Sequence, residues 1–594
     1  GFLAALEQDA KERAQRRRSN EQLANALKEQ GNEAFRQGDF ALAILSYSEG
    51  LQKLRDKQEL YTNRAQAYLK LHEYEKAISD CEWALKCNKN CLKAYFLMGK
   101  AHLALQHFTE ARQCYEKMLQ IDPQKENLVK DCVNEARLEE KRLREEERAE
   151  REAQAGNSAA SSIQELLQRI CSPGQDILYY TGGIRLLAEV VSSCSGQTFF
   201  RTNNGFSILS HEAVRGAFCA ESRSPAEEEL CVSLLLLWQA VCAGNEENQR
   251  VLMAQPGVGA QLAELLCSGT AQLQRETLAL VSLYSESEGG RRLLLRQDLS
   301  RWLQILMAFI KSTDARADSA MNILSDLIGE KRFQTQCQAT FSTGVLPLFT
   351  QLLVCARQVN PWALARGVAL LGSLCADVGL RAQLAQSRQC WQGCLHLLEE
   401  CPEYQQCVFA VLGLMMNLLL ESNGTIQDLA VPISGRCLAL LSHQDGRIVT
   451  RATGVLSRVL AASPSAVQAA VEGGVVKKML KFLKAGGHLT STYAIKTLSI
   501  CTKSSRRAQE ELLKGDKRFR LLLKLLQAGD ELLVGNAAFC LGQCLLLPGA
   551  ASSLLGSAVV PLLLRQAGGD AQRTSVQQNS AIALGRLCVA EPRY

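Results

Sequence analysis

Residues 60–88, LYTNRAQAYLKLHEYEKAISDCEWALKCN, decide the fold of the first part of the chain, because their pattern recurs on both sides of them. A step of 34 residues from Tyr61 reaches Leu27 in one direction and Tyr95 in the other. Three further series share this period: Gly31, Ala65 and Gly99; Ala43, Ala77 and Ala111; and Tyr47, Cys81 and Tyr115. Small residues recur where two helices must touch closely, and larger ones recur where the next unit packs. The pattern predicts three helix-turn-helix units over residues 24–123, the last closing at Pro123.

This 34-residue pattern resembles the tetratricopeptide repeat (TPR) of co-chaperones. In those proteins two lysines, two asparagines and an arginine form a carboxylate clamp for the C-terminal Glu-Glu-Val-Asp of cytosolic chaperones. The resemblance places four clamp positions on Lys28, Asn32, Asn63 and Lys93, and places the arginine position on Leu97. Charge-assisted hydrogen bonds to carboxylates contribute about 1.5 to 3 kcal/mol each, and a lysine cannot replace the planar fork of arginine. We therefore expect a weakened or redirected clamp; the alternative is asparagines that satisfy backbone groups at turns and lysines that are solvated.

From Ile163 onward the period is longer. Apolar anchors recur at intervals of 41 to 47 residues, at Leu237, Leu280, Leu324, Leu371, Met415, Leu456, Leu498, Leu541 and Leu584. The text around them is similar, as in GVALLGSLC (367–375), NAAFCLGQCL (536–545) and NSAIALGRLC (579–588). This period and text resemble the third helices of armadillo repeats. Gly183, Gly344 and Gly474 each precede a leucine-rich helix, which predicts short interhelical turns at these positions.

The predicted fold class is all-α, with two helical-repeat solenoids: a TPR superhelix followed by an armadillo-repeat superhelix. We expect a leading charged helix over residues 1–23, three TPR repeats over 24–123 and a charged capping or linker helix over 124–156. Residues 157–162, NSAASS, suit a hinge. Armadillo-like repeats, about nine in number, follow over residues 163–594, with an irregular insertion near 197–229.

A stack of armadillo repeats leaves a concave groove lined by one helix from every unit, and such grooves bind extended polypeptides. We assign the groove to Asn417, Arg458, Gln543 and Arg586. The groove resembles that of nuclear import adaptors, whose third helices carry repeated Trp-x-x-x-Asn pairs. No tryptophan occupies the matching positions here, so we do not expect binding of a classical import signal.

Composition and motifs exclude several classes of function. The chain of 594 residues has 67 Lys and Arg against 61 Asp and Glu, a net charge of +6 that gives no reason to expect a nucleic-acid partner. We find no phosphate-binding loop, no nucleophile elbow and no His-Glu-x-x-His motif, and therefore expect no enzyme, no cofactor and no metal. No apolar stretch is long enough to predict a membrane span. The 23 cysteines are unevenly spaced and indicate reduced thiols in a cytoplasmic protein.

One basic stretch stands apart from these assignments. Lys477, Lys478, Lys481 and Lys484 recur at helical spacing beside apolar residues. This pattern predicts an amphipathic helix of the repeat array, and a site for an acidic partner is the alternative.

Over its whole length, the chain is similar to a family of TPR-plus-armadillo proteins that assemble axonemal dynein arms. The resemblance rests on the TPR block, the charged helix and the units RATGVLSRVL (451–460), GGVVKKMLKFL (473–483) and LLVGNAAFCLGQCL (532–545). It implies a cytoplasmic factor for motile cilia and sperm flagella. The TPR repeats would bind a chaperone tail or another dynein assembly factor, and the armadillo groove would bind dynein subunits. A myosin-chaperone adaptor and a general cytoskeletal scaffold are the alternatives.

Overall fold

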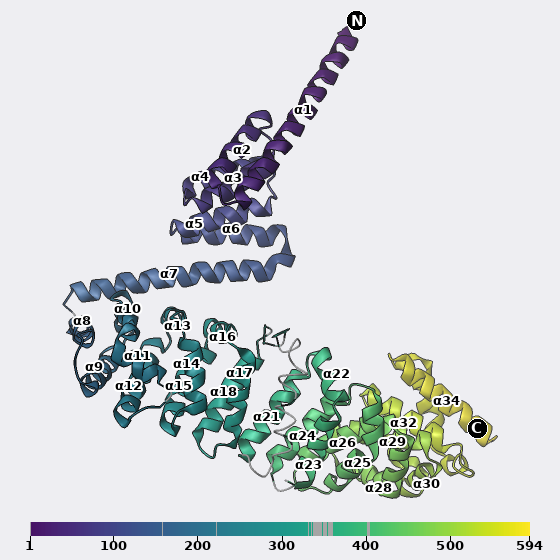
Figure 1. The fold of residues 1–594 in the computed structure, drawn as a ribbon. Coiled ribbons are helices and arrows are strands. Elements are labelled where there is room, and N and C mark those ends of the chain that lie inside the picture. The colour runs from purple at the N-terminus through teal and green to yellow at the C-terminus, as the bar shows by residue number, and fades with distance from the viewer. Residues whose placement is uncertain are drawn as a thin grey trace. The chain divides into compact units, whose positions relative to one another are not determined.

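A computed structural model describes residues 2–594 except 157, 221, 331, 334, 337–346, 348–352, 354–359 and 401–403. Every regular element within this described part is helical, so the predicted all-α fold built of helical repeats is confirmed. The chain divides into two compact units (Figure 1). Unit 1 comprises Gly1–Glu165 and Val190–Gly205, and unit 2 comprises Leu166–Glu189 and Phe206–Tyr594. None of the described helices is long and apolar enough to cross a membrane.

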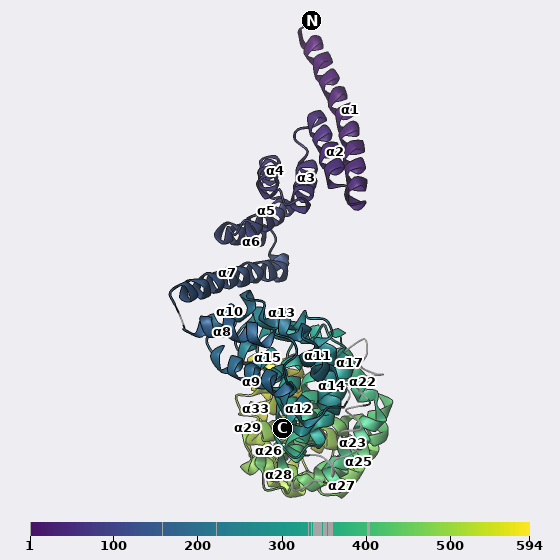
Figure 2. The same cartoon turned by 60° about the vertical axis from the view of Figure 1, so that its left-hand side comes forward.

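Unit 1 begins with three pairs of antiparallel helices. They are α1 (Phe2–Arg36) with α2 (Phe40–Lys53), α3 (Gln58–Lys70) with α4 (Tyr74–Cys87), and α5 (Leu92–Ala104) with α6 (Phe108–Ile121). Each helix packs against the next one along the chain. The residues of the predicted leading helix, 1–23, form one continuous helix with the first repeat helix, and α1 extends well beyond α2 in both views (Figures 1 and 2).

The 34-residue period has a direct packing explanation. A Cβ atom added to Gly31 would lie 2.5 Å from the Tyr47 ring, and one added to Gly99 would lie 2.5 Å from the Tyr115 ring. Both tyrosines are almost fully buried. In the second repeat the corresponding pair is Ala65 and Cys81, in which a smaller partner leaves room for a methyl group. The two series therefore vary together because the helices of each pair must approach to a fixed distance.

The turns within the three repeats also follow the period. Gly38, His72 and Gln106 all have positive φ, at 84°, 60° and 62°. The left-handed conformation is favourable only for glycine, and the other two residues adopt it at an energetic cost. The sequence did not indicate these positions, because only the first of them is a glycine.

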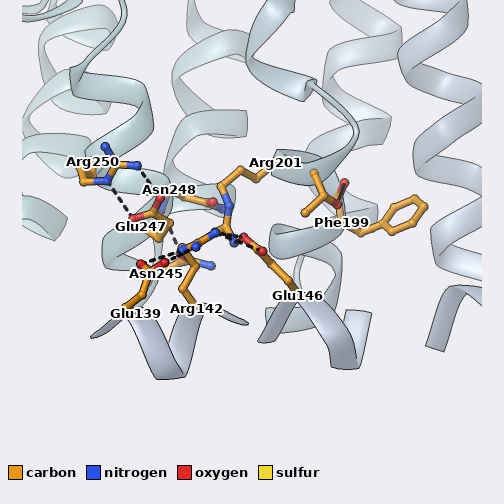
Figure 3. A network of polar contacts seen from close by, with 10 residues as sticks. Glu139, Arg142, Glu146, Phe199, Arg201, Asn245, Glu247, Asn248 and Arg250 are labelled. Carbon is orange, nitrogen blue, oxygen red and sulfur yellow. Dashed lines mark hydrogen bonds and ion pairs between the residues drawn. The ribbon is translucent and has the colours of Figure 1, made fainter. Parts of the chain in front are cut away.

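The charged stretch predicted as a capping or linker helix forms α7 (Glu126–Gln154), which follows the short 3-10 helix η1 (Pro123–Lys125). Arg142 on α7 donates hydrogen bonds to Glu139 and Glu146 on the same helix, the latter at 3.0 Å. The helix α10 (Cys194–Thr202) packs against α7, and its Arg201 donates to Glu146 at 2.8 Å (Figure 3). Segments that lie more than 50 residues apart are thus joined within unit 1 by an ion-pair network.

Unit 2 is organised around nine helices, which we call the ladder helices because each packs against the next. They are α12 (Pro225–Cys242), α15 (Ala271–Glu286), α18 (Ala315–Ile328), α21 (Pro361–Leu374), α24 (Gln405–Leu418), α26 (Gly446–Val459), α29 (His488–Ser504), α32 (Glu531–Cys544) and α34 (Thr574–Ala590). The nine predicted anchors fall one on each ladder helix. The first eight are fully buried, whereas Leu584 is half-buried because α34 packs against a ladder helix on one side only.

Local sequence begins most of the ladder helices. Six of the nine start at a side chain that accepts a hydrogen bond from a backbone N–H of the first turn: Ser224, Thr270, Asp314, Asn360, Asp445 and Asp530. These caps satisfy N–H groups that have no partner within the helix.

Shorter helices connect the ladder helices. Among the described residues they are α9 (Ile177–Val190), α11 (Glu212–Cys219), α13 (Glu246–Met253), α14 (Val258–Ser268), α16 (Glu288–Leu294), α17 (Leu299–Ala308), α22 (Val378–Gln386), α23 (Arg388–Glu400), α25 (Gly424–Leu440), α27 (Pro464–Glu472), α28 (Val475–Ala485), α30 (Arg506–Gly515), α31 (Arg520–Leu525) and α33 (Val559–Arg565). The residues of the predicted insertion near 197–229 form the end of α10, the 3-10 helix η2 (Gly205–Ser210), α11 and the start of α12.

The three turn glycines have different outcomes. Gly474 caps the N-terminus of α28 with φ of 79°, as predicted. The prediction for Gly183 is wrong: it lies inside α9, where an added Cβ would approach Ile170 to 2.9 Å, so close packing is what requires glycine. Gly344 lies outside the described residues. In the predicted hinge, Asn157 is also outside them, and helix α8 (Ser158–Ile170) already begins at Ser158.

Candidate peptide-binding sites

Three of the four predicted clamp residues form one hydrogen-bonded line across the first helices of the three repeats. Lys93 on α5 donates from Nζ to Oδ1 of Asn63 on α3 at 2.7 Å. Asn63 in turn donates from Nδ2 to Oδ1 of Asn32 on α1 at 3.0 Å. The structure therefore brings together residues that are separated by about one repeat length each along the chain.

Tyr47 is a fourth member of this line, and the clamp comparison did not include it. Its hydroxyl donates to Oδ1 of Asn32 at 2.9 Å. Burial raises the pKa of Tyr47 to about 12, so the hydroxyl keeps its proton at neutral pH. The bond fixes the amide of Asn32 against the inner helix α2. The recurrence of Tyr47 at the 34-residue period was the sequence signal that could have indicated it.

Lys28, the remaining clamp residue, contacts an acidic neighbour instead of the line. Its Nζ lies 3.5 Å from Oε1 of Glu29. The other carboxylate oxygen of Glu29 accepts a hydrogen bond from Nδ2 of Asn32 at 3.2 Å. The hydrogen bond from Asn32 and the charge of Lys28 lower the pKa of Glu29. A carboxylate of the protein itself thus bridges two residues that a ligand carboxylate would use.

Lys93 has an environment suited to recognition of an anion. Partial burial lowers its pKa, because removal of water disfavours the charged ammonium. Its only hydrogen-bond partner is the neutral amide of Asn63. A ligand carboxylate beside this ammonium would supply the negative charge that the surrounding protein does not.

Leu97 lies one helical turn beyond Lys93 on α5, where the clamp family has arginine. It is 5% exposed and belongs to the apolar core of the repeats. The position therefore serves packing in this chain, and no guanidinium fork is present on this turn.

Arg64, the residue after Asn63, stabilises the site from the inner side. It forms a bidentate ion pair with Asp80 on α4, with both N–O distances at 2.7 Å, and donates to Oγ of Ser48 on α2 at 2.8 Å. Asp80 is 4% exposed. Three helices are joined at this point, and the backbone that carries Asn63 is held in place.

The residues assigned to the groove of unit 2 lie on ladder helices and are all half-buried. Asn417 on α24 donates from Nδ2 to the carbonyl oxygen of Gly372 on α21 at 3.0 Å. Arg586 on α34 donates to the carbonyl of Gly542 on α32 at 2.9 Å, and Arg458 on α26 donates to the carbonyl of Met416 on α24. Three of the four assigned side chains thus bind the preceding ladder helix; for Gln543 the structure records no such bond.

Positive charge gathers beside these bonds. On α26, Arg451 stacks over the Phe409 ring with its guanidinium carbon 3.4 Å from the ring centre. Lys496 on α29 is exposed, and the nearby charge of Arg458 together with partial burial lowers its pKa. No ion pair to a carboxylate is recorded for these three cations within the described residues. Their arrangement can bind an acidic segment.

Catalytic and metal chemistry have no equivalent arrangement in the described chain. No group of three or more His, Cys, Asp and Glu side chains there could hold a metal ion. The cysteines that the structure describes are free thiols, and those in the cores have raised pKa values because burial disfavours the thiolate, as for Cys437 at about 12.

Comparison with known proteins places these observations in a family context. The family model described as tetratricopeptide repeat matches residues 59–91 and 92–125. The chain is 48% identical over 600 residues to human tetratricopeptide repeat protein 12 and 45% identical to the mouse protein, and each alignment covers 100% of this chain and 85% of the relative.

A shorter similarity concerns the N-terminal repeats. The solved structure described as the first TPR of Spaghetti (RPAP3) bound to the HSP90 peptide SRMEEVD is 37% identical, with a TM-score of 0.18, and the match covers 19% of this chain and 93% of that chain. Mouse RNA polymerase II-associated protein 3 is 41% identical over 106 residues, which are 18% of this chain and 16% of the relative.

Proposed function

This chain belongs to the family of tetratricopeptide repeat protein 12, and from that membership we propose that it acts in the cytoplasmic preassembly of axonemal dynein arms for motile cilia and sperm flagella. The chain is a protein-binding scaffold with co-chaperone-like TPR repeats. Within the proposed role, the TPR repeats bind the C-terminal tail of a chaperone or another assembly factor. The second unit binds a dynein subunit.

The observation that carries the first half of the proposal is the line from Lys93 through Asn63 to Asn32. It presents an ammonium and two amides on one face, and such groups bind the carboxylates of a peptide terminus. Glu29 occupies Lys28 and Asn32 in the free protein, so an incoming carboxylate must displace it. Together with leucine at position 97, this favours a clamp of modest affinity.

Isothermal titration of the 594-residue chain with the peptide SRMEEVD tests this half. We expect binding that Lys93→Ala weakens about tenfold or more, since one charge-assisted contact contributes about 1.5 to 3 kcal/mol. Lys117→Ala on α6 is the matched control, because it removes an exposed lysine outside the line and should leave binding unchanged. An equal loss in both variants, or undiminished binding of a peptide with an amidated C-terminus, would refute the clamp.

Displacement of Glu29 gives a second and independent readout. Glu29→Gln keeps the size of the side chain and a hydrogen-bond acceptor, and it removes the negative charge beside Lys28. We expect tighter peptide binding, because the variant removes both a competitor for Lys28 and a repulsion between carboxylates. Weaker binding would show that the Glu29 charge supports the site.

The second half of the proposal rests on the cations of the ladder helices α26 and α29. Arg451, Arg458 and Lys496 lie on adjacent helices and favour an acidic segment of a dynein subunit. Affinity purification of the tagged chain from ciliated cells tests this role. Lys496→Glu should reduce recovery of dynein chains, and Lys311→Glu, an exposed lysine on the 3-10 helix η3 (Phe309–Lys311), should not. Loss of dynein on Lys93→Ala with no effect of Lys496→Glu would assign dynein to the TPR repeats, and recovery of myosin in place of dynein would refute the proposal.

A further inference from the structure

Unit 2 carries a second positively charged region, which takes no part in the proposed function. Two adjoining cavities of about 1050 and 460 Å³ lie along α28, α30 and α31 and share Lys484, Lys514 and Gly515. Lys477, Lys481 and Lys484 line them from α28. Lys514, Lys517, Arg520 and Lys524 line them from α30 and the segment that follows. We call these seven side chains the basic surface; all of them are exposed.

The acidic side chains in the cavities are already occupied. Glu511 accepts a hydrogen bond from Arg507 on the same helix at 2.9 Å. Asp516 is 5% exposed, and its carboxylate accepts from the backbone N–H groups of Leu521 at 3.0 Å and Leu522 at 3.1 Å. No residue of the basic surface forms an ion pair or hydrogen bond that the structure records, so its positive charge is uncompensated within the described chain.

Helix stability does not account for the charge. Cations favour the C-terminal turn of a helix, which explains Lys484 and Lys514. Lys477 and Lys478, however, are the third and fourth residues of α28, where the N-terminal end of the helix repels them. The first turn of α28 contains no acidic residue to offset this repulsion. The lysines at this end are therefore retained against the local electrostatics.

A strained turn orients the far end of the basic surface. Arg518 and Phe519 are consecutive non-glycine residues in the left-handed conformation, with φ of 56° and 52°. Phe519 is fully buried and the Asp516 carboxylate holds the next helix, so the surrounding structure enforces the turn. Such strain concentrates at functional positions. Here it places Lys517 and Arg520 on either side of the buried ring, both lining the smaller cavity.

The larger cavity also has an apolar lining. Leu441, Leu480 and Phe482 contribute to it, and Leu480 lies so close to Gly515 that a Cβ there would approach its Cδ1 to 2.5 Å. Gly515 therefore allows α30 to close against α28. Lysines surround this apolar area rather than forming a continuous stripe.

We propose that the basic surface is a docking site for an acidic peptide segment of a partner protein, with glutamates or aspartates on the lysines and an apolar side chain against Leu441, Leu480 and Phe482. Charge complementarity selects the acidic residues, and the apolar lining selects the side chain between them. A peptide fits these features better than a nucleic acid, whose single strands bind along rows of stacking aromatic rings. Phe482 is the aromatic residue among the described side chains that line the cavities.

Fluorescence anisotropy with the whole chain tests the site. The probe is a labelled peptide in which pairs of glutamates alternate with leucine. We expect saturable binding that weakens with salt and falls about tenfold or more in the double variant Lys481→Glu with Lys514→Glu, because two charge contacts become repulsive. The control double variant Lys311→Glu with Lys503→Glu makes the same change in net charge at exposed lysines outside both cavities, and it should bind like the unaltered chain.

The remaining arms separate the outcomes. Replacement of the leucines in the peptide by serine should weaken binding, and unchanged affinity would overturn the apolar part of the site. Equal losses in the two double variants would show that binding follows net charge alone and overturn the proposal. Stronger binding of a single-stranded oligonucleotide or of vesicles containing phosphatidylserine, lost in the same Lys481 and Lys514 variant, would assign the surface to another class of partner. Undiminished binding of SRMEEVD by that variant would keep this result distinct from the TPR clamp.

Discussion

Replacement of Leu97 by arginine should convert the weakened clamp into a stronger one. Residues 93 and 97 are separated by one turn of α5, so their side chains project on the same face of the helix. An arginine at position 97 would place a planar fork beside the Lys93 ammonium, and a carboxylate can accept two hydrogen bonds from such a fork.

Two opposing magnitudes decide the result. The additional contact should contribute about 1.5 to 3 kcal/mol, which corresponds to about 10- to 150-fold in Kd. Leu97 is 5% exposed, and its loss from the core should cost about 1 to 3 kcal/mol of folding stability, moderated because the methylene stem of arginine can cover part of the same apolar surface. The cost affects the unfolding equilibrium, so it does not reduce the affinity of chains that remain folded.

Isothermal titration with SRMEEVD measures the gain, and circular dichroism at the same temperature establishes the folded fraction. Leu97→Lys is the matched control, since it adds the charge without the fork and should give a smaller gain. A peptide with an amidated C-terminus should show little of the improvement. A folded arginine variant that binds no better than the lysine variant, or that gains equally toward the amidated peptide, would refute the reasoning.

Three further predictions concern the repeats themselves. Gly99→Ala should lower stability by about 1 to 3 kcal/mol, because the new methyl group would overlap the Tyr115 ring. Thermal unfolding should show partial recovery when Tyr115→Cys is added, and strictly additive losses would contradict the size pairing. Gln106→Gly should raise stability by up to about 1 kcal/mol by relieving a left-handed residue, whereas Leu105→Gly in the same turn should lower it. Burial and the neighbouring His107 lower the pKa of His102 below 6.5. Its contribution to stability is therefore present above pH 6.5 and is lost as the pH falls through the folded-state pKa, so denaturant titrations of His102→Asn should depend less on pH in this range; an unchanged dependence would exclude His102 as the cause.

Much of the fold could be predicted from the sequence because repeat proteins are built from local units. Each unit buries its apolar face only against its neighbours, so the same residue types recur at a fixed interval. The nine anchors from Leu237 to Leu584 identified the nine ladder helices, and the 34-residue series identified the helix pairs of unit 1. The exception was Gly183, whose spacing predicted a turn although the residue lies inside α9. A glycine required by a close neighbour and a glycine required by its backbone angle look the same in a single sequence.

The sequence by itself therefore determined the all-α architecture, its two periods and the residues that face a neighbouring repeat. Tertiary structure alone decided how the polar side chains were used. Glu29 is the direct neighbour of Lys28, yet only the fold shows that it also bonds Asn32. Asn417 directs its amide to the Gly372 carbonyl, 45 residues earlier in the chain. The reason is that a hydrogen bond depends on distance and angle within a few tenths of an ångström, whereas helical periodicity specifies only the face on which a side chain lies.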